Sequence, residues 1–367
     1  MPGPSLQWDL FCRVIDNHGD LGVCWRLARR LAALGQRVRL WVDDASALAW
    51  MAPQGAAGVE TMPWRDPTAP ERPGDVVVEA FGCDPPAGFV EAMAAADPAP
   101  VWINLEYLSA ERAAERNHGL PSPQLHGPGA GLCKWFFYPG FSPATGGLLR
   151  EEGLASDRDR FEPVAWLAGL GIDALPHARR ISLFCYEQAA LAATLARWRQ
   201  ASTQLLVTPG FAARQVAGVL GVGGAPGTVA RQDALRVHFL PWLTQDDYDR
   251  LLWSCDLNLV RGEDSLVRAL WAARPFVWQL YPQCDGAHGP KLEAFLDDHL
   301  AGAPTDLALS LGAVFRHWNG LAAPPAAEPA PGPWQAWSRE REARLATALS
   351  ARGDLGSQLY RYALSKR

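Results

Sequence analysis

The residues best suited to chemistry form a phosphate-binding turn, RGEDS, at 261–265. An apolar strand expected at Leu257–Val260 runs into this turn, and a helix follows directly. The unpaired N–H groups at the start of a helix, together with the helix dipole, favour an anion. Arg261 adds a permanent cation whose planar fork matches phosphate oxygens, while Gly262 lets the backbone approach closely and Ser265 offers a hydroxyl. The turn therefore predicts a diphosphate site that works without a metal.

A second turn, VIDNHGDLG at residues 14–22, follows the first expected strand and opens the first expected helix. In a doubly wound sheet this carboxyl edge is where ligands bind. The turn lacks G-x-G-x-x-G, which disfavours NAD or FAD. Asp16 and Asp20 are candidates for a general base and its positioning partner, because a carboxylate accepts a proton or orients an N–H nucleophile. The structural alternative is that Asp20 caps the helix and Asp16 ends the turn.

The elements that must position these turns alternate between β-like runs and helical patterns. This alternation predicts an α/β fold with two Rossmann-like halves, with ligands bound in the cleft between them. A connector is expected near residues 168–180, and a last helix reaches back to the first half. The predicted domains are 1–178, with a helix at about 352–367 packing on it, and 179–351. Strands are expected at 8–15, 38–42, 75–81, 101–105, 181–187, 205–209 and 237–242.

Composition narrows the class of protein further. The net charge of −5 and the lack of a Lys/Arg block argue against sequence-independent nucleic-acid binding. No N-terminal export signal and no apolar run of about 18 residues is visible, so we expect neither export nor a membrane span. The seven cysteines lack a C-x-x-C pair, which is typical of free thiols in a reducing cytoplasm. No Cys/His cluster indicates zinc.

Five sequence blocks carry a resemblance that runs almost end to end. FCRVIDNHGDLGVCWRLARRL, VWINLEYLSAE, KWFFYPGF, ISLFCYE and RGEDSLVRALWAARPFVWQLYPQCDGAH together resemble the protein-arginine rhamnosyltransferases of bacterial elongation factor P. The resemblance implies a GT-B glycosyltransferase, whose two Rossmann-like domains face each other across a cleft. It implies inverting transfer from dTDP-β-L-rhamnose to an arginine of cytoplasmic elongation factor P, which activates that factor to rescue polyproline-stalled ribosomes. No cofactor is expected.

On the acceptor side, the resemblance makes Asp20 the catalytic base or aligner, with Asp16 and Asn17 beside it. Gly19 belongs to the same turn. An arginine keeps its proton at pH 7, so Asp20 is expected to hold one N–H by a charged hydrogen bond and to take its proton as the C–N bond forms. Glu106 is a further candidate for acceptor contact, and a capping or loop role is its alternative.

On the donor side, the resemblance assigns the diphosphate to Arg261, to the backbone amides of Asp264 and Ser265, and to Tyr186. These groups would stabilise the departing dTDP, on which negative charge accumulates in the transition state. Glu263 is implied as an essential, catalytic neighbour whose role stays open. Its carboxylate would meet sugar or ribose hydroxyls, or pair with Arg261.

The resemblance also places a nucleotide-base site at residues 239–248. Trp242 and Tyr248 would flank the donor, and the amide of Gln245 would match the adjacent N–H and carbonyl of thymine. The family usually has phenylalanine at both aromatic positions, which leaves the stacking geometry open. The structural alternative makes Trp242 a core residue and Gln245 an ordinary residue of a helix start.

Several other polar residues near the expected turns are predicted to have structural roles. Asp43 and Asp44 are expected to cap the following helix instead of binding a metal. His18 is expected to pack, and His288 either approaches the donor or leads into a helix.

Two alternative functions remain open on the residues. One is a GT-B enzyme acting on a small molecule, such as a nucleotide-sugar epimerase or a natural-product glycosyltransferase. The other is a catalytically silent nucleotide-sugar sensor, against which the paired carboxylates argue.

Overall fold

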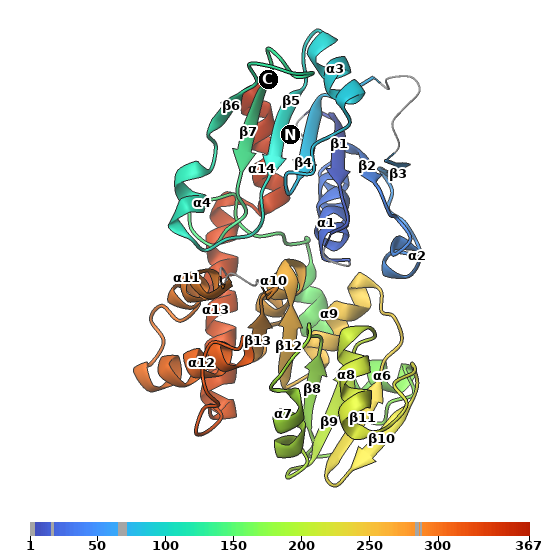
Figure 1. The fold of residues 1–367 in the computed structure, drawn as a ribbon, viewed down its shortest axis with the longest axis vertical. Helices are drawn as coiled ribbons and strands as arrows, with labels where there is room; N and C mark the ends of the chain where they lie inside the picture. The colour runs from blue at the N-terminus through green and yellow to red at the C-terminus, as the bar shows by residue number, and fades with distance from the viewer. Residues whose placement is uncertain (1–3, 16–17, 65–71, 283–285, 287) are drawn as a thin grey trace. The chain divides into compact units, whose positions relative to one another are not determined.

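The computed structural model describes residues 4–15, 18–64, 72–282, 286 and 288–367. Contacts divide the chain into two compact α/β units (Figure 1). Unit 1 holds the described residues up to Glu152 together with Ala346–Arg367, and unit 2 holds Gly153–Leu345. Helix α13 (Pro331–Arg352) contributes residues to both units.

Unit 1 contains a seven-stranded sheet in which β6 alone, among the described strands, pairs antiparallel. In sheet order the strands are β3 (Val59–Pro63), β2 (Arg37–Val42), β1 (Gln7–Cys12), β4 (Val76–Ala80), β5 (Val101–Leu105), β7 (Cys133–Phe137) and β6 (Pro121–Pro123). Its helices are α1 (Gly19–Ala33), α2 (Leu48–Met51), α3 (Ala87–Ala95), α4 (Arg112–Asn117) and α14 (Leu355–Lys366). Strand order reverses between β1 and β4, as in a Rossmann sheet.

Unit 2 contains a six-stranded sheet in which, within the described part, only the edge strand β10 is antiparallel. In sheet order the strands are β10 (Val229–Gln232), β11 (Leu235–Phe239), β9 (Thr203–Val207), β8 (Arg179–Leu183), β12 (Leu257–Arg261) and β13 (Phe276–Gln279). Its helices are α5 (Leu154–Arg160), α6 (Pro163–Gly169), α7 (Leu191–Trp198), α8 (Phe211–Leu220), α9 (Gln245–Ser254), α10 (Gly262–Ala272), α11 (His288–His299) and α12 (Thr305–Trp318). Here the order reverses between β8 and β12.

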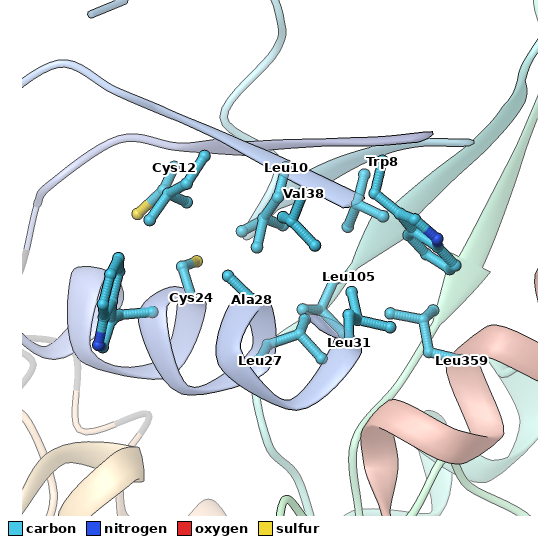
Figure 2. Close-up of a cluster of buried hydrophobic side chains, with 14 of the residues drawn as sticks. Trp8, Leu10, Cys12, Cys24, Leu27, Ala28, Leu31, Val38, Leu105 and Leu359 are labelled. Atoms are coloured by element: carbon cyan, nitrogen blue, oxygen red, sulfur yellow. The ribbon is translucent and has the colours of Figure 1, made fainter. Parts of the chain in front are cut away.

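The core of unit 1 shows why its elements form where they do. Cys24, Ala28 and Leu31 recur at helical spacing on the inner face of α1, and Figure 2 shows them facing Leu10 and Val38 of the sheet. Strands β1, β4 and β5 are buried almost throughout. Burial on both faces explains their continuous apolar sequences, which are typical of parallel strands.

Helix α14 is an integral part of this unit. Leu355, Leu359 and Ala363 belong to the same buried cluster as α1, and Figure 2 shows Leu359 on the α14 ribbon beside that cluster. Asp354 caps α14 by accepting hydrogen bonds from the Gly356 and Ser357 amides, and its carboxylate also pairs with Arg30 of α1 at 2.7 Å. The cap thus also ties α14 to α1.

The segment before residue 179 differs from the sequence-based expectation. The connector expected near residues 168–180 is preceded by helices α5 and α6, and α6 packs against α9 through Leu167 and Leu251. That packing groups both helices with unit 2, whereas the sequence assigns residues up to 178 to the first domain. The contacts thus end the first stretch of unit 1 at Glu152 and end unit 2 at Leu345. The limits 178 and 351 stay predictions for the acceptor-binding and donor-binding domains.

Cysteines and helix lengths bear on the predicted class. Cys12, Cys24, Cys83, Cys185 and Cys255 are buried free thiols, Cys133 is a half-buried one, and Cys284 lies outside the described residues. Burial raises the pKa of the Cys83 and Cys185 thiols to about 12, so these sulfurs stay protonated at neutral pH. Helices in the described part of the chain are too short or too polar to cross a bilayer.

Candidate functional site

Each unit brings its predicted site residues to the point where strand order reverses. In unit 1, residues 13–15 follow β1 and His18 precedes α1, while Phe81 follows the neighbouring strand β4. In unit 2, residues 184–186 follow β8, and Arg261 ends the neighbouring strand β12. Ligands of open α/β sheets bind outside the carboxyl ends of strands at such switch points. Both predicted turns therefore occupy ligand-binding positions, one in each unit.

Asp20 is the second residue of α1 and is buried, with only 5% of its surface exposed. Its Oδ2 accepts a hydrogen bond of 2.9 Å from the backbone N–H of Ile15, which holds the β1–α1 loop against the helix start. The N-cap position falls on His18, which makes no side-chain capping hydrogen bond. Asp20 is therefore not the N-cap that the structural alternative assumed.

His18 and Val14, which lie in the same turn as Asp20, both contact side chains of the segment that follows β2. The His18 ring meets the Trp50 ring edge-on at 5.4 Å, in agreement with the expected packing role. Asp43 Oδ1 accepts from the Val14 amide at 2.9 Å, so Asp43 braces the β1–α1 loop. The expected capping by Asp43 and Asp44 is wrong, because the N-cap of α2 is Ala47. Asp16 and Asn17 lie outside the described residues, and Gly19 opens α1.

Glu106 follows β5 at the same carboxyl edge and is fixed from its own strand. Asn104 Nδ2 donates to Glu106 Oε1 at 2.8 Å, and Asn104 Oδ1 accepts from the Gly82 amide at 3.2 Å. Burial raises the pKa of Glu106, and the Asn104 hydrogen bond opposes part of that shift. The carboxylate is thus held in one orientation, without a helix-capping contact among these hydrogen bonds.

An aromatic pair adjoins Glu106. The rings of Phe81 and Tyr107 stack with centroids 4.4 Å apart and an interplanar angle of 14°. Phe81 has a φ of 60°, a left-handed conformation that is uncommon for an aromatic residue and that clusters at functional sites. Tyr107 is 39% exposed, so this carboxyl edge presents an aromatic surface next to a carboxylate.

In unit 2, Arg261 lies between aromatic rings. Its guanidinium carbon is 4.5 Å from the Phe184 ring centroid and 4.2 Å from that of Tyr186. These cation–π contacts fix the plane of a buried cation at the end of β12. Gly262 then adopts a left-handed φ of 67°, and its carbonyl accepts a 2.8 Å hydrogen bond from Trp278 Nε1. The turn before α10 is therefore rigidly held.

Tyr248 and Ser265 belong to the same cluster. The Tyr248 ring meets Phe184 edge-on at 5.8 Å. Burial raises the pKa of Tyr248, the nearby Ser265 side chain opposes that shift, and the charge of Asp264 adds to it. The structure thus brings together Tyr186, Tyr248, Arg261, Asp264 and Ser265, five of the seven predicted donor-binding residues.

The remaining two lie on the segment that leads into α9. Trp242 is 48% exposed, which is incompatible with the alternative that it is a core residue. Gln245 is buried as the first residue of α9, directly after Thr244, whose side chain caps the helix by accepting from the Asp247 amide. Burial of this amide fits either recognition of a base or a structural role, so its function stays a prediction.

Glu263 pairs with a residue that sequence reasoning missed. Its Oε1 lies 2.9 Å from Lys291 Nζ, which comes from the first turn of α11. Phe184 and Tyr281 were missed as well, and Tyr281 meets the Tyr186 ring edge-on at 5.3 Å. Their signal was available in part, because Phe184 and Tyr281 each follow a strand of the predicted parallel sheet. The pairing of Lys291 with Glu263 has no local sequence signal.

In the described ranges, no group of three or more His, Cys, Asp or Glu side chains is placed to hold an ion. The predicted site residues supply carboxylates in unit 1, and Arg261 with the α10 amides in unit 2. The first set suits a cationic N–H group, and the second suits a diphosphate. Two α/β units with these sites define the chain as a GT-B glycosyltransferase, and the predicted fold is confirmed by its likeness to solved structures.

The comparisons also show the family. The family described as Elongation-Factor P (EF-P) rhamnosyltransferase EarP matches residues 8–364, and the chain belongs to it. A protein-arginine rhamnosyltransferase of Pseudomonas aeruginosa is 46% identical, with 97% of this chain and 98% of the relative covered. One from Shewanella oneidensis is 38% identical over 86% of this chain and 89% of its own length. The predicted family resemblance is confirmed.

Solved structures agree. A structure described as the basis for EarP-mediated arginine glycosylation of translation elongation factor EF-P is 34% identical, with a TM-score of 0.70 over 99% of this chain and 100% of its own. Arabidopsis thaliana UGT89C1, solved with UDP-L-rhamnose, has a TM-score of 0.52 at 12% identity, over 99% of both chains. The second likeness concerns the fold alone.

Proposed function

We propose that this chain transfers L-rhamnose from dTDP-β-L-rhamnose to an arginine side chain of translation elongation factor P, inverting the anomeric carbon without a metal. The end-to-end family match carries this proposal, since relatives over nearly the whole chain are named protein-arginine rhamnosyltransferases. A rhamnosyltransferase needs an activated sugar, and a nucleotide sugar fits the anion site of unit 2. The cytoplasmic location follows from that acceptor.

The donor is held through its diphosphate and its base. Arg261, oriented by Phe184 and Tyr186, faces the same cluster as Ser265 at the start of α10. The backbone amides of Asp264 and Ser265 add the positive end of the helix dipole. Trp242, with half of its surface exposed, and the buried amide of Gln245 supply a stacking surface and hydrogen-bonding groups for thymine.

The acceptor arginine is held through its guanidinium. Asp20 accepts one N–H in a charged hydrogen bond and concentrates electron density on the attacking nitrogen. That nitrogen forms a bond to the anomeric carbon while the bond from that carbon to the phosphate oxygen breaks, and Asp20 takes the released proton. Glu106, with Tyr107 beside it, binds the cation from another edge. Asp16 and Asn17 are assigned to the same side on the resemblance alone.

The departing dTDP leaves with the electron pair of the broken bond. Because negative charge grows on it as the sugar becomes oxocarbenium-like, fixed donors in the α10 turn act mainly in the transition state. Trp278 and the aromatic rings around Arg261 hold those donors before the reaction begins. The mechanism requires that Asp20 and the donor sugar reach one another, and a crystal structure with donor bound tests that requirement.

Mass spectrometry of elongation factor P after incubation with this chain and dTDP-rhamnose tests the function. We expect the mass of one deoxyhexose on a single arginine, located by fragmentation. Elongation factor P with that arginine replaced by lysine serves as the control and stays unmodified. Unmodified wild-type factor alongside turnover of the donor with a small molecule would favour the small-molecule alternative, which the names of the relatives do not support.

A further inference from the structure

The ion pair between Glu263 and Lys291 joins the first turns of two helices of unit 2. Lys291 Nζ lies 2.9 Å from Glu263 Oε1, and the two side chains are only 28% and 18% exposed. Glu263 is the second residue of α10, directly after Gly262 in the phosphate-binding turn. The ammonium of Lys291 is therefore positioned at the turn that, under the proposed function, holds the diphosphate of the donor.

The charge of this turn requires a second cation. Glu263 and Asp264 both lie in the first turn of α10, where negative charge favours the helix but opposes an incoming diphosphate. Arg261 offsets one of these charges. Arg268 of the same helix is committed elsewhere, because its guanidinium makes buried bonds of 2.7 and 2.6 Å to both carboxylate oxygens of Asp249. Lys291 supplies the missing positive charge.

Residue 291 is one of few lysines in a chain whose basic residues are mostly arginine. Only 3 of the 34 basic residues in the chain are lysines, so arginine is the usual cation of this protein. An ammonium carries three N–H donors on a compact charge, whereas guanidinium donors lie in one plane. A lysine can keep one N–H on Glu263 and direct another at a phosphate oxygen.

We propose that Lys291 binds the diphosphate of the nucleotide-sugar donor directly, and that Glu263 is the positioning residue that holds its ammonium at the α10 turn. This inference rests on the proposed function and deepens it. It gives Glu263 a role different from both earlier expectations, pairing with Arg261 or contact with sugar hydroxyls. An acidic residue beside a diphosphate is then explained, because the Glu263 carboxylate holds the ammonium of Lys291 at the site.

Binding of dTDP to the full chain, measured by titration calorimetry, tests the inference. Loss of one charge-assisted hydrogen bond should weaken dTDP binding roughly tenfold or more in Lys291→Met, with thymidine affinity unchanged. The matched control is Arg316→Met, which removes the 2.7 Å pair with Glu293 that joins α11 to α12. This control should bind dTDP like the wild type, and Lys291→Arg should recover part of the loss.

Glu263→Gln separates the positioning role from direct contact with the sugar. If Glu263 acts through Lys291, the single variant weakens binding of dTDP, which contains no transferable sugar, and the double variant binds no worse than Lys291→Met. Wild-type dTDP affinity in Lys291→Met, with melting temperatures matched to the control, would overturn the inference. That result would leave rhamnosylation of elongation factor P by the wild type intact, so the two failures are distinguishable. A wild type that bound no dTDP would overturn both the donor assignment and this inference.

Discussion

The carboxyl edges of the two sheets follow one topological plan but present different charged groups to a ligand. In unit 1, the acidic group Asp20 follows β1 at the switch point, and Glu106 follows β5, the strand beyond β4. In unit 2, the switch point between β8 and β12 carries Arg261, with Lys291 beside it. The fold therefore sets where a ligand binds, while a few side chains set which charge the ligand must have.

The two edges also differ in how they hold their charged groups. Arg261 lies between two aromatic rings, whereas the carboxylates of Asp20 and Glu106 accept hydrogen bonds, including those from Ile15 and Asn104. A leaving group needs donors that are in place before charge develops. A carboxylate that takes a proton must instead change its bonding during the reaction. Aromatic packing around the cation fits the first task, and carboxylates held by hydrogen bonds fit the second.

The largest expected effect comes from removing the proton acceptor of unit 1. Asp20→Asn should lower turnover on the order of 10³-fold, because the amide cannot take a proton, while dTDP-rhamnose affinity stays within about twofold. Single-turnover kinetics and donor titration measure the two quantities. Asp44→Asn, in an exposed turn of the same unit, is the control. Normal turnover of Asp20→Asn would show that unit 1 does not supply the proton acceptor through Asp20.

A smaller effect is expected from altering the cation of unit 2. Arg261→Lys keeps the charge but loses the planar fork and the stacking on Phe184 and Tyr186. The loss of a charged hydrogen bond should reduce kcat/KM for the donor about 10- to 100-fold. Arg344→Lys, at an exposed ion pair with Glu340, should leave kinetics unchanged. Equal kinetics for both variants would show that charge alone suffices.

Glu106→Gln should raise the KM for elongation factor P about tenfold and leave the donor KM unchanged, since a neutral amide attracts a guanidinium less. Burial raises the pKa of Glu106, so its carboxyl gains a proton, and loses attraction for the acceptor, at a higher pH than an ordinary glutamate. The wild-type acceptor KM should therefore rise as the pH falls, and the variant should lack this rise. Glu111→Gln, exposed in the same unit, should keep the wild-type profile.

The smallest effect on activity is expected from the core of unit 2, at His299. This imidazole is buried among Phe276, Phe295 and Phe315, and burial lowers its pKa to about 3. The unfolded chain binds a proton below about pH 6.5, so stability falls as the pH drops from there toward 3, by up to about 1.4 kcal/mol per pH unit.

His299→Phe should flatten this pH dependence and leave kcat unchanged, as followed by denaturant melts between about pH 4 and pH 7. Its Nδ1 has no hydrogen-bond partner among the described residues, so phenylalanine removes no such bond there. A variant with unaltered pH dependence would assign the acid sensitivity to other groups. Loss of activity at neutral pH would instead link this core to the donor site.

Local sequence patterns predicted those strands whose burial makes a short stretch of sequence continuously apolar. Alternating apolar runs gave β5 as Val101–Leu105 and placed β12 within one residue, because buried parallel strands are continuously apolar. The short helices α5 and α6 were not predicted because each has only seven residues, and the segment that follows them indicates a connector.

In the candidate site too, local features could be predicted from the sequence and long-range contacts could not. Both ligand-binding turns were visible because each joins a strand to a helix within about ten residues. The partners that orient them come from distant parts of the chain. Phe184 reaches Arg261 from another strand, Trp278 holds Gly262 from β13, and Lys291 meets Glu263 from α11. Such contacts depend on tertiary packing, and no spacing in one sequence encodes them.

The packing of α14 onto α1 sets an order of events during synthesis. Leu355, Leu359 and Ala363 complete the apolar interior of unit 1, yet the ribosome makes them only after every residue of unit 2. Unit 2 can therefore acquire its native interior while the earlier-made unit still exposes the surface that α14 will cover. The half of the protein that is translated first is the half that finishes folding last.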